Sequence, residues 1–279
     1  MLIRANAKIN WTLDTVGVRA DGYHLLDMLM QSISLHDTLT LEPAQELTFS
    51  ADGATRVPQD EGNLALRAAL ALRRHTGTER GATIHLHKRI PSGAGLGGGS
   101  ADAAAVLHGL NALWELNLPM ETLRQIGLTL GADVPFCLTG GLCRARGLGE
   151  ALTPLPSRSR RVLLVKPAQG LSTPEVFHAF DRLARPDPAD NEAAARALAL
   201  GDDELLARSA RNMLIDAAIS LCPEVRETLL ALRELGASFC AMSGSGSACL
   251  ALFPEKRFPT KEELCLCPSF CLPTYTTAG

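Results

Sequence analysis

The sequence is poor in aromatic residues and has no excess of positive charge. Phe, Trp and Tyr make up 4% of the 279 residues, and 27 Lys and Arg stand against 30 Asp and Glu, for a formal net charge of −3. Surfaces that bind nucleic acid concentrate basic side chains, often with aromatic rings among them. No basic run with interleaved aromatics occurs here. The composition therefore argues against nucleic acid as a partner.

The sequence also shows no apolar segment typical of a membrane helix or an export signal. Arg4 and Lys8 interrupt the first residues, so no signal-peptide core is expected there. The uncharged stretch 235–254 is long enough to cross a bilayer, but its middle reads Ser243-Gly-Ser-Gly-Ser247, which indicates a glycine loop between two strands. Eight cysteines without paired spacing favour reduced thiols. We predict a cytoplasmic protein that does not associate with membranes.

The sequence contains a glycine-rich loop between a predicted strand and a predicted helix. Five glycines fall within 93–99. Residues 83–90 alternate as a strand does, and the apolar residues of 106–114 recur at helical intervals. Glycines let backbone N–H groups approach a ligand, and a helix N-terminus adds partial positive charge. The order strand, glycine loop, helix therefore predicts a phosphate-binding site.

Two familiar phosphate-binding loops do not match this segment. A Walker A loop needs Gly-Lys-Ser/Thr, whereas Ser100 follows Gly99 directly. A dinucleotide fingerprint needs a further glycine and a continuous apolar strand before it, and both are missing. A glycine turn without a ligand is the remaining alternative. It is disfavoured because so many glycines cost backbone entropy on folding.

Asp133 and Lys8 are candidates for a reactive pair. Asp133 lies among apolar neighbours, and a buried carboxylate needs a cation or several donors. Lys8 could supply the cation from an early strand, where it shares a face with Asn10. The alternative is that Asp133 is an ordinary helix-end or Asx-turn residue. A phosphate site with an Asp–Lys pair suits phosphoryl transfer to a hydroxyl: the carboxylate takes or orients the hydroxyl proton and the lysine stabilises charge.

The periodicity predicts an α+β protein of two domains, 1–155 and 156–279, divided at the Pro-rich segment 153–157. The tail from about 256 is expected to be atypical or disordered. Its Cys265, Cys267 and Cys271, with no histidine nearby, make a poor zinc pattern. Strands are predicted at 3–13, 35–41, 47–49, 83–90, 162–165, 238–242 and 248–253. Helices are predicted after the glycine loop and at 63–74, 120–130, 190–200, 203–220 and 223–235.

Taken together, these segments resemble the GHMP small-molecule kinases. The second motif of that superfamily, Pro-x3-Gly-Leu-Gly-(Gly/Ser)2-Ser-Ala, corresponds to residues 91–101. Within the superfamily, the chain is similar to the kinases of the non-mevalonate isoprenoid pathway that act on a cytidine diphosphate ester of methylerythritol. The other matching segments are 7–10, 19–24, 62–64, 88–91, 128–135, 173–177 and 243–246.

The resemblance implies a fold and a reaction. It implies an N-terminal ribosomal-protein-S5-like domain that binds ATP and a C-terminal ferredoxin-like domain, with the active site between them. The expected reaction is ATP-dependent phosphorylation of the 2-hydroxyl of the methylerythritol group in isoprene (terpenoid) biosynthesis. ATP is the co-substrate and Mg²⁺ its metal, with no dedicated metal-binding residues in the chain. A monomer or weak homodimer is expected.

The resemblance also implies roles for individual residues. Asp133 would be the general base and Lys8 its charged partner. Tyr23 and Phe177 would sandwich the cytosine ring, which His24 would hydrogen-bond. The remaining substrate-binding residues implied are Asn10, beside the diphosphate or sugar alcohol, and Gly244 and Gly246. The ATP-binding residues implied are Pro91, Gly93, Ala94, Gly95, Leu96, Gly97, Gly98, Gly99, Ser100 and Ala101, with Asn63 and Lys88 beside the adenine.

Several alternatives stay open at this point. A GHMP kinase for homoserine, mevalonate or galactose would lack the pocket for the base, and a decarboxylase of the same fold would lack it as well. A nucleotide-binding regulator would not need the Asp–Lys pair. Phe177 could be a core aromatic and His24 could cap a turn. The family pattern Asn-Asp-apolar-Glu is replaced here by Asn212-Met-Leu-Ile215.

Overall fold

A computed structural model describes residues 1–260, 263 and 270–277. The chain forms two compact units that interleave in sequence. Unit 1 comprises Met1–Lys8, Ser34–Pro91 and Gly97–Gly140, and unit 2 comprises Ile9–Ile33, Ser92–Leu96 and Gly141–Gly279. Strands β1 (Leu2–Val18) and β2 (His24–Ala44) are long enough to contribute to both. The predicted domains 1–155 and 156–279 stay a prediction. The two compact units do not follow this division, because each combines several separate segments of the chain.

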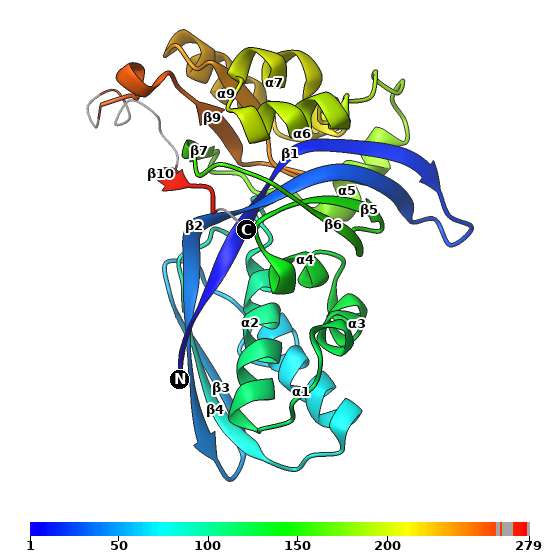
Figure 1. The fold of residues 1–279 in the computed structure, drawn as a ribbon, viewed down its shortest axis with the longest axis vertical. Helices are drawn as coiled ribbons and strands as arrows, with labels where there is room; N and C mark the ends of the chain where they lie inside the picture. Colours follow the sequence, from blue (N-terminus) through cyan, green and yellow to red (C-terminus); the bar gives the residue numbers. More distant parts are fainter. Residues whose placement is uncertain (261–262, 264–269, 278–279) are drawn as a thin grey trace. The chain divides into compact units, whose positions relative to one another are not determined.

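Unit 1 consists of strands packed against four helices. β2 pairs antiparallel with β4 (Gly81–Lys88), and β3 (Leu47–Gly53) pairs parallel with β4. The predicted alternation along β4 is confirmed, because Ile84 and Leu86 are buried. The helices lie on one side of β3 and β4 (Figure 1). They are α1 (Leu64–Thr76), α2 (Gly98–Leu113), α3 (Met120–Leu130) and α4 (Val134–Thr139).

The core of unit 1 forms where small residues let the helices approach closely. α2 buries four alanines in its first two turns, and α1 buries Ala65, Ala68 and Ala69. Alanine is also the best helix former, so the same residues favour both the helices and their close packing. α1 begins at a capping residue and ends at Gly77, whose φ of 70° is typical of a helix C-terminus.

Unit 2 contains the rest of β1 and β2 and a second sheet. Here β2 pairs with β5 (Leu142–Gly147), and β5 pairs with β6 (Ala151–Leu155). The second sheet has the order β10-β7-β9-β8. Its strands are β7 (Arg161–Lys166), β8 (Phe239–Met242), β9 (Cys249–Leu252) and β10 (Phe270–Tyr275).

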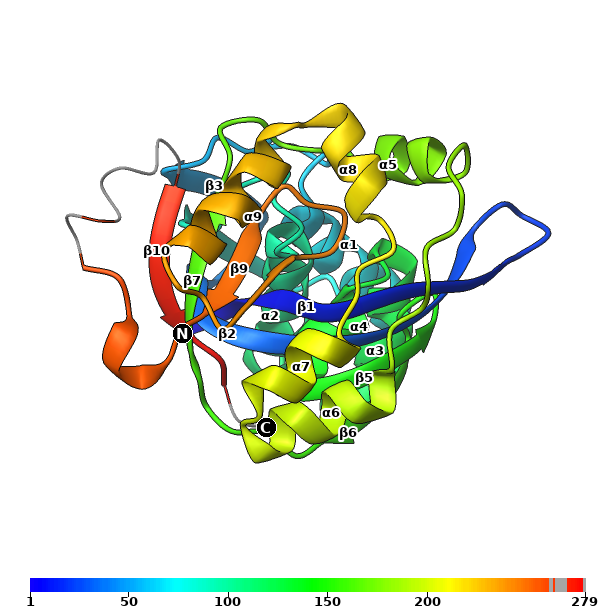
Figure 2. The ribbon, with the colours of Figure 1, turned by 90° about the horizontal axis from the view of Figure 1, so that it is seen from above.

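The helices of unit 2 cover this sheet and each other. α9 contacts β8 and β9, and α6 contacts α7 (Figure 2). The bounds are α5 (Thr173–Phe180), α6 (Asn191–Leu200), α7 (Asp203–Ser209), α8 (Ile215–Leu221), α9 (Glu224–Glu234) and the 3₁₀ turn η1 (Glu255–Arg257). Among the described residues, none of the helices combines the length and apolarity that a bilayer crossing requires.

Two local predictions were wrong. The Pro-rich segment expected to be a break contains β6, because Pro154 lies in a strand at the end of its sheet, where a missing N–H is tolerated. The expected helix 203–220 is two helices, interrupted where Asn212 forms a bridge with Leu13. The atypical tail from about 256 stays a prediction; its described part includes β10, which pairs antiparallel with β7 and contains Pro273. Cys265 and Cys267 lie outside the described residues.

Candidate active site

The predicted Asp133–Lys8 pair is present in unit 1. The ammonium of Lys8 lies 3.3 Å from Oδ2 of Asp133, and the two side chains are 6% and 28% exposed. Lys8 comes from β1, whereas Asp133 directly precedes α4. Within the described chain, the Asp133 carboxylate makes no capping hydrogen bond to α4. This position is therefore an ion pair with solvent access rather than an ordinary helix cap.

The backbone of Gly97, at the end of the glycine loop, lies next to Lys8 and Asp133. Its φ of 66° is left-handed, and it forms the N-cap of α2. A Cβ atom at Gly97 would lie 2.9 Å from Cγ of Lys8 and 3.5 Å from Oδ2 of Asp133. Only glycine allows both the backbone conformation and this approach. The first turn of α2 and the ion pair therefore form one group in unit 1.

Residues 93–95, in the first half of the glycine loop, belong to unit 2 and are fixed by other residues of that unit. The carbonyl of Gly93 accepts from the N–H of Leu171 at 3.0 Å, and that of Ala94 accepts from the N–H of Ala248 at 3.1 Å. The hydroxyl of Ser243 donates to the carbonyl of Gly95 at 3.0 Å. These bonds fix a stretch with alternating left-handed glycines. A preorganised loop of this kind suits the binding of phosphate groups.

Gly244 and Gly246 lie in the β8–β9 connection, with φ values of 57° and 86°. The predicted glycine loop between two strands is present, and the connection is a hairpin because β8 and β9 pair antiparallel. The connection is also the partner of the glycine loop just described, since it carries Ser243. A Cβ at Gly95 would collide with the Ser243 carbonyl. Sequence reasoning missed Ser243; its signal was a serine beside the Gly-x-Gly pattern.

Asn10 is buried next to this connection. Its backbone N–H donates to the Ser243 hydroxyl at 3.2 Å, and its side-chain amide lies 3.3 Å from Sδ of Met28. The side chain is therefore fixed inside unit 2. A role of Asn10 toward a diphosphate or sugar alcohol stays a prediction.

The structure brings together two of the three residues predicted to bind a base. The rings of His24 and Phe177 are stacked, with centroids 4.7 Å apart and planes 26° from parallel. Phe177 is half-buried, so it is not the core aromatic of the alternative; the neighbouring Phe180 is. The side chain of Tyr23 is 64% exposed. An exposed aromatic beside a stacked pair is compatible with a flat ligand.

Asp181 is a further residue of this group that the sequence did not reveal. Its Oδ1 lies 2.8 Å from Nε2 of His24. Asp181 follows α5 four residues after Phe177, and this spacing places both side chains on the same face. The carboxylate favours a proton on Nε2, which leaves Nδ1 of a neutral His24 as an acceptor.

Asn63 and Lys88 are both engaged within unit 1. The carboxamide oxygen of Asn63 accepts from the N–H of Ala65 at 2.9 Å, which caps α1. The ammonium of Lys88 is buried between the carboxylates of Asp37 and Asp102. The observed contacts of both side chains are structural, and their place beside an adenine stays a prediction.

Comparison with known proteins identifies the family. The GHMP kinases N terminal domain matches residues 63–141, and the GHMP kinases C terminal domain matches residues 194–263. A 4-diphosphocytidyl-2-C-methyl-D-erythritol kinase of Carboxydothermus hydrogenoformans is 45% identical over 260 residues, which cover 90% of this chain and 88% of that protein. The kinase of the same name from Brucella melitensis is 43% identical over 270 residues, with 92% and 87% covered. The chain belongs to the 4-diphosphocytidyl-2-C-methyl-D-erythritol kinase family.

Solved structures agree with this assignment. A crystal structure of a 4-(cytidine 5'-diphospho)-2C-methyl-D-erythritol kinase matches with a TM-score of 0.84 and 37% identity over the whole of both chains. A homoserine kinase from Cytophaga hutchinsonii matches with a TM-score of 0.72 and 20% identity, covering 99% and 95% of the two chains. The second match shows the shared fold alone. The predicted α+β GHMP kinase fold is confirmed.

The departure from the 4-diphosphocytidyl-2-C-methyl-D-erythritol kinase family at 212–215 has a local structural substitute. The Asn212 amide donates to the carbonyls of Met242 and Gly244, at 2.9 and 2.8 Å. The thioether of Met213 lies 3.2 Å from the backbone N of Thr15. Asn212 therefore still supports the β8–β9 connection without the acidic neighbours.

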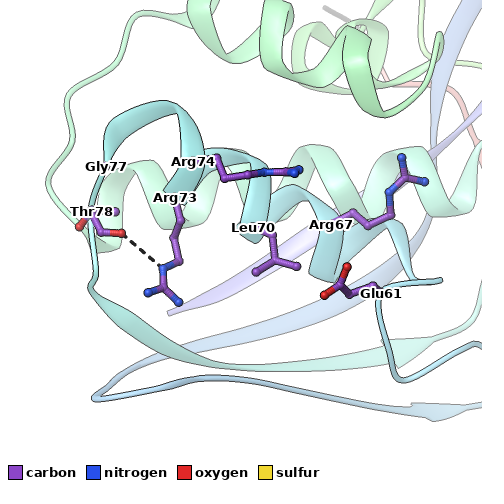
Figure 3. Close-up of a pocket in the computed structure, with 7 residues that line it drawn as sticks. All are labelled: Glu61, Arg67, Leu70, Arg73, Arg74, Gly77 and Thr78. Atoms are coloured by element: carbon purple, nitrogen blue, oxygen red, sulfur yellow. Dashed lines mark hydrogen bonds between the residues drawn. The ribbon is translucent and has the colours of Figure 1, made fainter.

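A separate surface pocket of this family member lies along α1, and none of the predicted site residues lines it (Figure 3). Its lining includes Arg67, Arg73 and Arg74 beside Glu61. The guanidinium of Arg73 donates to the carbonyl of Thr78 at 3.3 Å, as the dashed line shows. Three cations with one carboxylate form a solvated basic face. The glycine loop stays the predicted phosphate site.

Proposed function

We propose that this small-molecule kinase transfers the γ-phosphoryl group of ATP to the 2-hydroxyl of 4-diphosphocytidyl-2-C-methyl-D-erythritol. The products are the 2-phosphate and ADP, formed in the non-mevalonate isoprenoid pathway. The observation that carries the chemistry is the Asp133–Lys8 pair against Gly97 of the glycine loop. We expect the enzyme to act in the cytoplasm as a monomer or weak homodimer.

In this proposal each group has one task. The carboxylate of Asp133 orients the substrate hydroxyl and receives its proton as the oxygen attacks phosphorus. The Lys8 ammonium keeps that carboxylate in place and offsets negative charge on the phosphoryl oxygens. The glycine loop and the N-terminus of α2 bind the phosphates. Phosphoryl transfer depends mainly on such positioning and electrostatic stabilisation.

Magnesium fits this site as a companion of ATP. Among the described residues, no group of three His, Cys, Asp or Glu side chains is placed to hold a metal ion. Mg²⁺ usually keeps several waters and binds substrate phosphates, so the protein need not supply a dedicated group of carboxylates. When bound, the ion would neutralise phosphate charge.

The cytidine group is assigned to the aromatic residues of unit 2. Tyr23 and Phe177 offer stacking surfaces, and the His24 ring offers a hydrogen bond to the base. The Asp181 carboxylate sets which nitrogen of His24 is the acceptor. An acceptor at Nδ1 suits the exocyclic amino group of cytosine, which is a donor, better than the carbonyl of uracil.

The test is ATP consumption by the purified protein with four acceptors: 4-diphosphocytidyl-2-C-methyl-D-erythritol, mevalonate, homoserine and galactose. We expect turnover with the cytidine compound alone and its loss in Asp133→Asn. Turnover with another acceptor would reassign the substrate. ATP binding without any turnover would favour a nucleotide-binding protein.

A further inference from the structure

A buried ionic cluster of Asp37, Lys88 and Asp102 lies in unit 1. The ammonium of Lys88 is 2.7 Å from Oδ2 of Asp102 and also hydrogen-bonds Oδ2 of Asp37. The three side chains are at most 3% exposed. They come from β2, β4 and α2. Two carboxylates share one cation, and none of the three residues belongs to the reactive pair described above.

The cluster connects the chain before the glycine loop with the helix after it. The second carboxylate oxygen of Asp37 accepts from the N–H groups of Arg89 at 2.5 Å and Ile90 at 2.8 Å. These two residues lead from β4 into the loop. Asp102 lies in the second turn of α2, which leads out of it. Lys88, bonded to both carboxylates, joins the two ends of the loop.

The start of α2 is packed directly on this cluster. A Cβ atom at Gly98 would lie 2.9 Å from Cγ2 of Ile90 and 3.4 Å from Nζ of Lys88. The glycine therefore brings the helix N-terminus as near to the ammonium as packing allows. Any movement of Lys88 would be transmitted to the backbone of the loop at this contact.

Stability alone does not account for such a cluster. Removing three charged groups from water is costly, and an apolar trio of similar volume often gives equal or greater stability. The cluster also holds two carboxyl groups against one cation, and burial favours a proton on Asp102. Among the described residues, Oδ1 of Asp102 has no hydrogen-bond partner. Hydrogen bonds between charged groups fix direction and distance, so this cluster suits a place where the position of the backbone matters more than stability.

We propose that Asp37, Lys88 and Asp102 are positioning residues that hold the two ends of the glycine loop at the spacing the ATP phosphates require. This inference rests on the proposed function only in taking the loop as the ATP site. The ammonium of Lys88 pairs with Asp37 and Asp102, whereas Asp133 pairs with Lys8. The cluster therefore sets ATP affinity more than the rate of the chemical step.

The protonation of Asp102 should make ATP binding depend on pH. A purely structural role of the cluster would not produce this dependence. Burial raises the pKa of Asp102 to about 8, opposed by Lys88 and aided by Asp37. On α4, the thiol of Cys137 interacts electrostatically with Asp102, Asp133 and Lys8, and desolvation raises the pKa of this thiol. Ionisation of Asp102 adds negative charge near the N-terminus of α2. ATP binding should therefore weaken as pH rises through this range.

The experiment compares Lys88→Met and Asp102→Asn with the wild type. We expect Lys88→Met to raise KM for ATP at least tenfold, with kcat changed less than threefold and KM for the acceptor unchanged. Asp102→Asn retains an oxygen for Lys88, so KM for ATP at pH 7 should stay within threefold. In the wild type, KM for ATP should rise between pH 7 and 9. In Asp102→Asn this rise should disappear. The control is Glu121→Gln, which removes an exposed pair with Arg124 on α3.

Lower thermal stability with an unchanged KM for ATP in both variants would overturn the inference and leave the cluster a structural one. If Lys88→Met does not fold, Lys88→Arg and the pH profile of Asp102→Asn decide between the two roles. Equilibrium binding of ATP to each variant separates this inference from the proposed function. A wild type that binds ATP but phosphorylates no acceptor would contradict only the latter.

Discussion

The Asp133 carboxylate lies 3.3 Å from the Lys8 ammonium, although the first directly precedes α4 and the second lies near the start of β1. Lys8 is buried and Asp133 is partly exposed, so the pair presents a carboxylate oxygen toward solvent while the cation stays behind it. The Gly97 backbone lies against both side chains. Substitutions at these three positions should therefore affect turnover far more than folding.

Replacement of Asp133 by asparagine should lower kcat by roughly 10²–10⁴-fold, the usual contribution of a positioned general base. The amide keeps the size of the side chain but cannot accept the hydroxyl proton. Equilibrium binding of ATP should change little. The control is Asp216→Asn at an exposed position of α8. Turnover within a few-fold of wild type in Asp133→Asn would remove this residue from the mechanism.

Replacement of Gly97 by alanine should reduce activity through Lys8. A left-handed φ costs an alanine about 1 kcal/mol, and the new methyl group would press on Cγ of Lys8. Gly77→Ala is the matched control: its φ is 70°, but a Cβ there meets nothing within 4 Å. We expect similar losses in urea unfolding free energy and at least a tenfold fall in kcat for Gly97→Ala alone. Equal kcat values in the two variants would show that the contact of Gly97 with Lys8 does not control turnover.

Replacement of Phe177 by alanine should raise KM for the cytidine substrate roughly three- to tenfold, since an aromatic stack contributes about 0.5–1.5 kcal/mol. Asp181→Asn should raise it by a smaller factor, because Asp181 acts through His24 and is half-exposed. KM for ATP should stay unchanged in both variants. Glu175→Gln, exposed on the same helix, is the control. An unchanged KM for the cytidine substrate in Phe177→Ala would contradict the assignment of the base.

The raised pKa of Asp102 should make stability depend on pH. Between about pH 4 and 8 the folded state keeps a proton on Asp102 that the unfolded chain has released, so unfolding releases a proton. The free energy of unfolding should therefore fall as pH rises through this window, by on the order of 1 kcal/mol per pH unit at most. Urea unfolding of wild type and Asp102→Asn at several pH values measures the difference. Parallel curves would mean that Asp102 is ionised throughout.

Local sequence patterns were sufficient to predict most helices and strands, but not to predict where a helix or strand is interrupted. α3 matches its predicted range, and α1 and β4 match within two residues at each end. Proline suggested a break where β6 forms, because a sequence does not show which strand lies at the end of a sheet. The division of the helix expected at 203–220 depends on Asn212, whose partners are distant in sequence.

The site followed a similar rule. The sequence predicted the Asp133–Lys8 pair and grouped His24 with Phe177, and the structure shows both contacts. Their roles toward substrate and ATP stay predictions. Asp181, Ser243 and the Asp37–Asp102 relationship could not be predicted, since each depends on which segments meet in three dimensions. Lys88 illustrates the difference: its motif suggested a contact with ATP, whereas its ammonium is buried between two carboxylates.

The sequence by itself therefore determined the α+β class and the place of the glycine loop, because periodicity and glycine spacing act over a few residues. Its short motifs determined the family. Only the tertiary structure decided which side chains are paired, which are capped and which remain exposed. The partner of each charge or hydrogen-bonding group depends on which segments, such as β1, β2, α2 and α4, the fold brings together. Burial then sets the free-energy cost of leaving such a group unpaired.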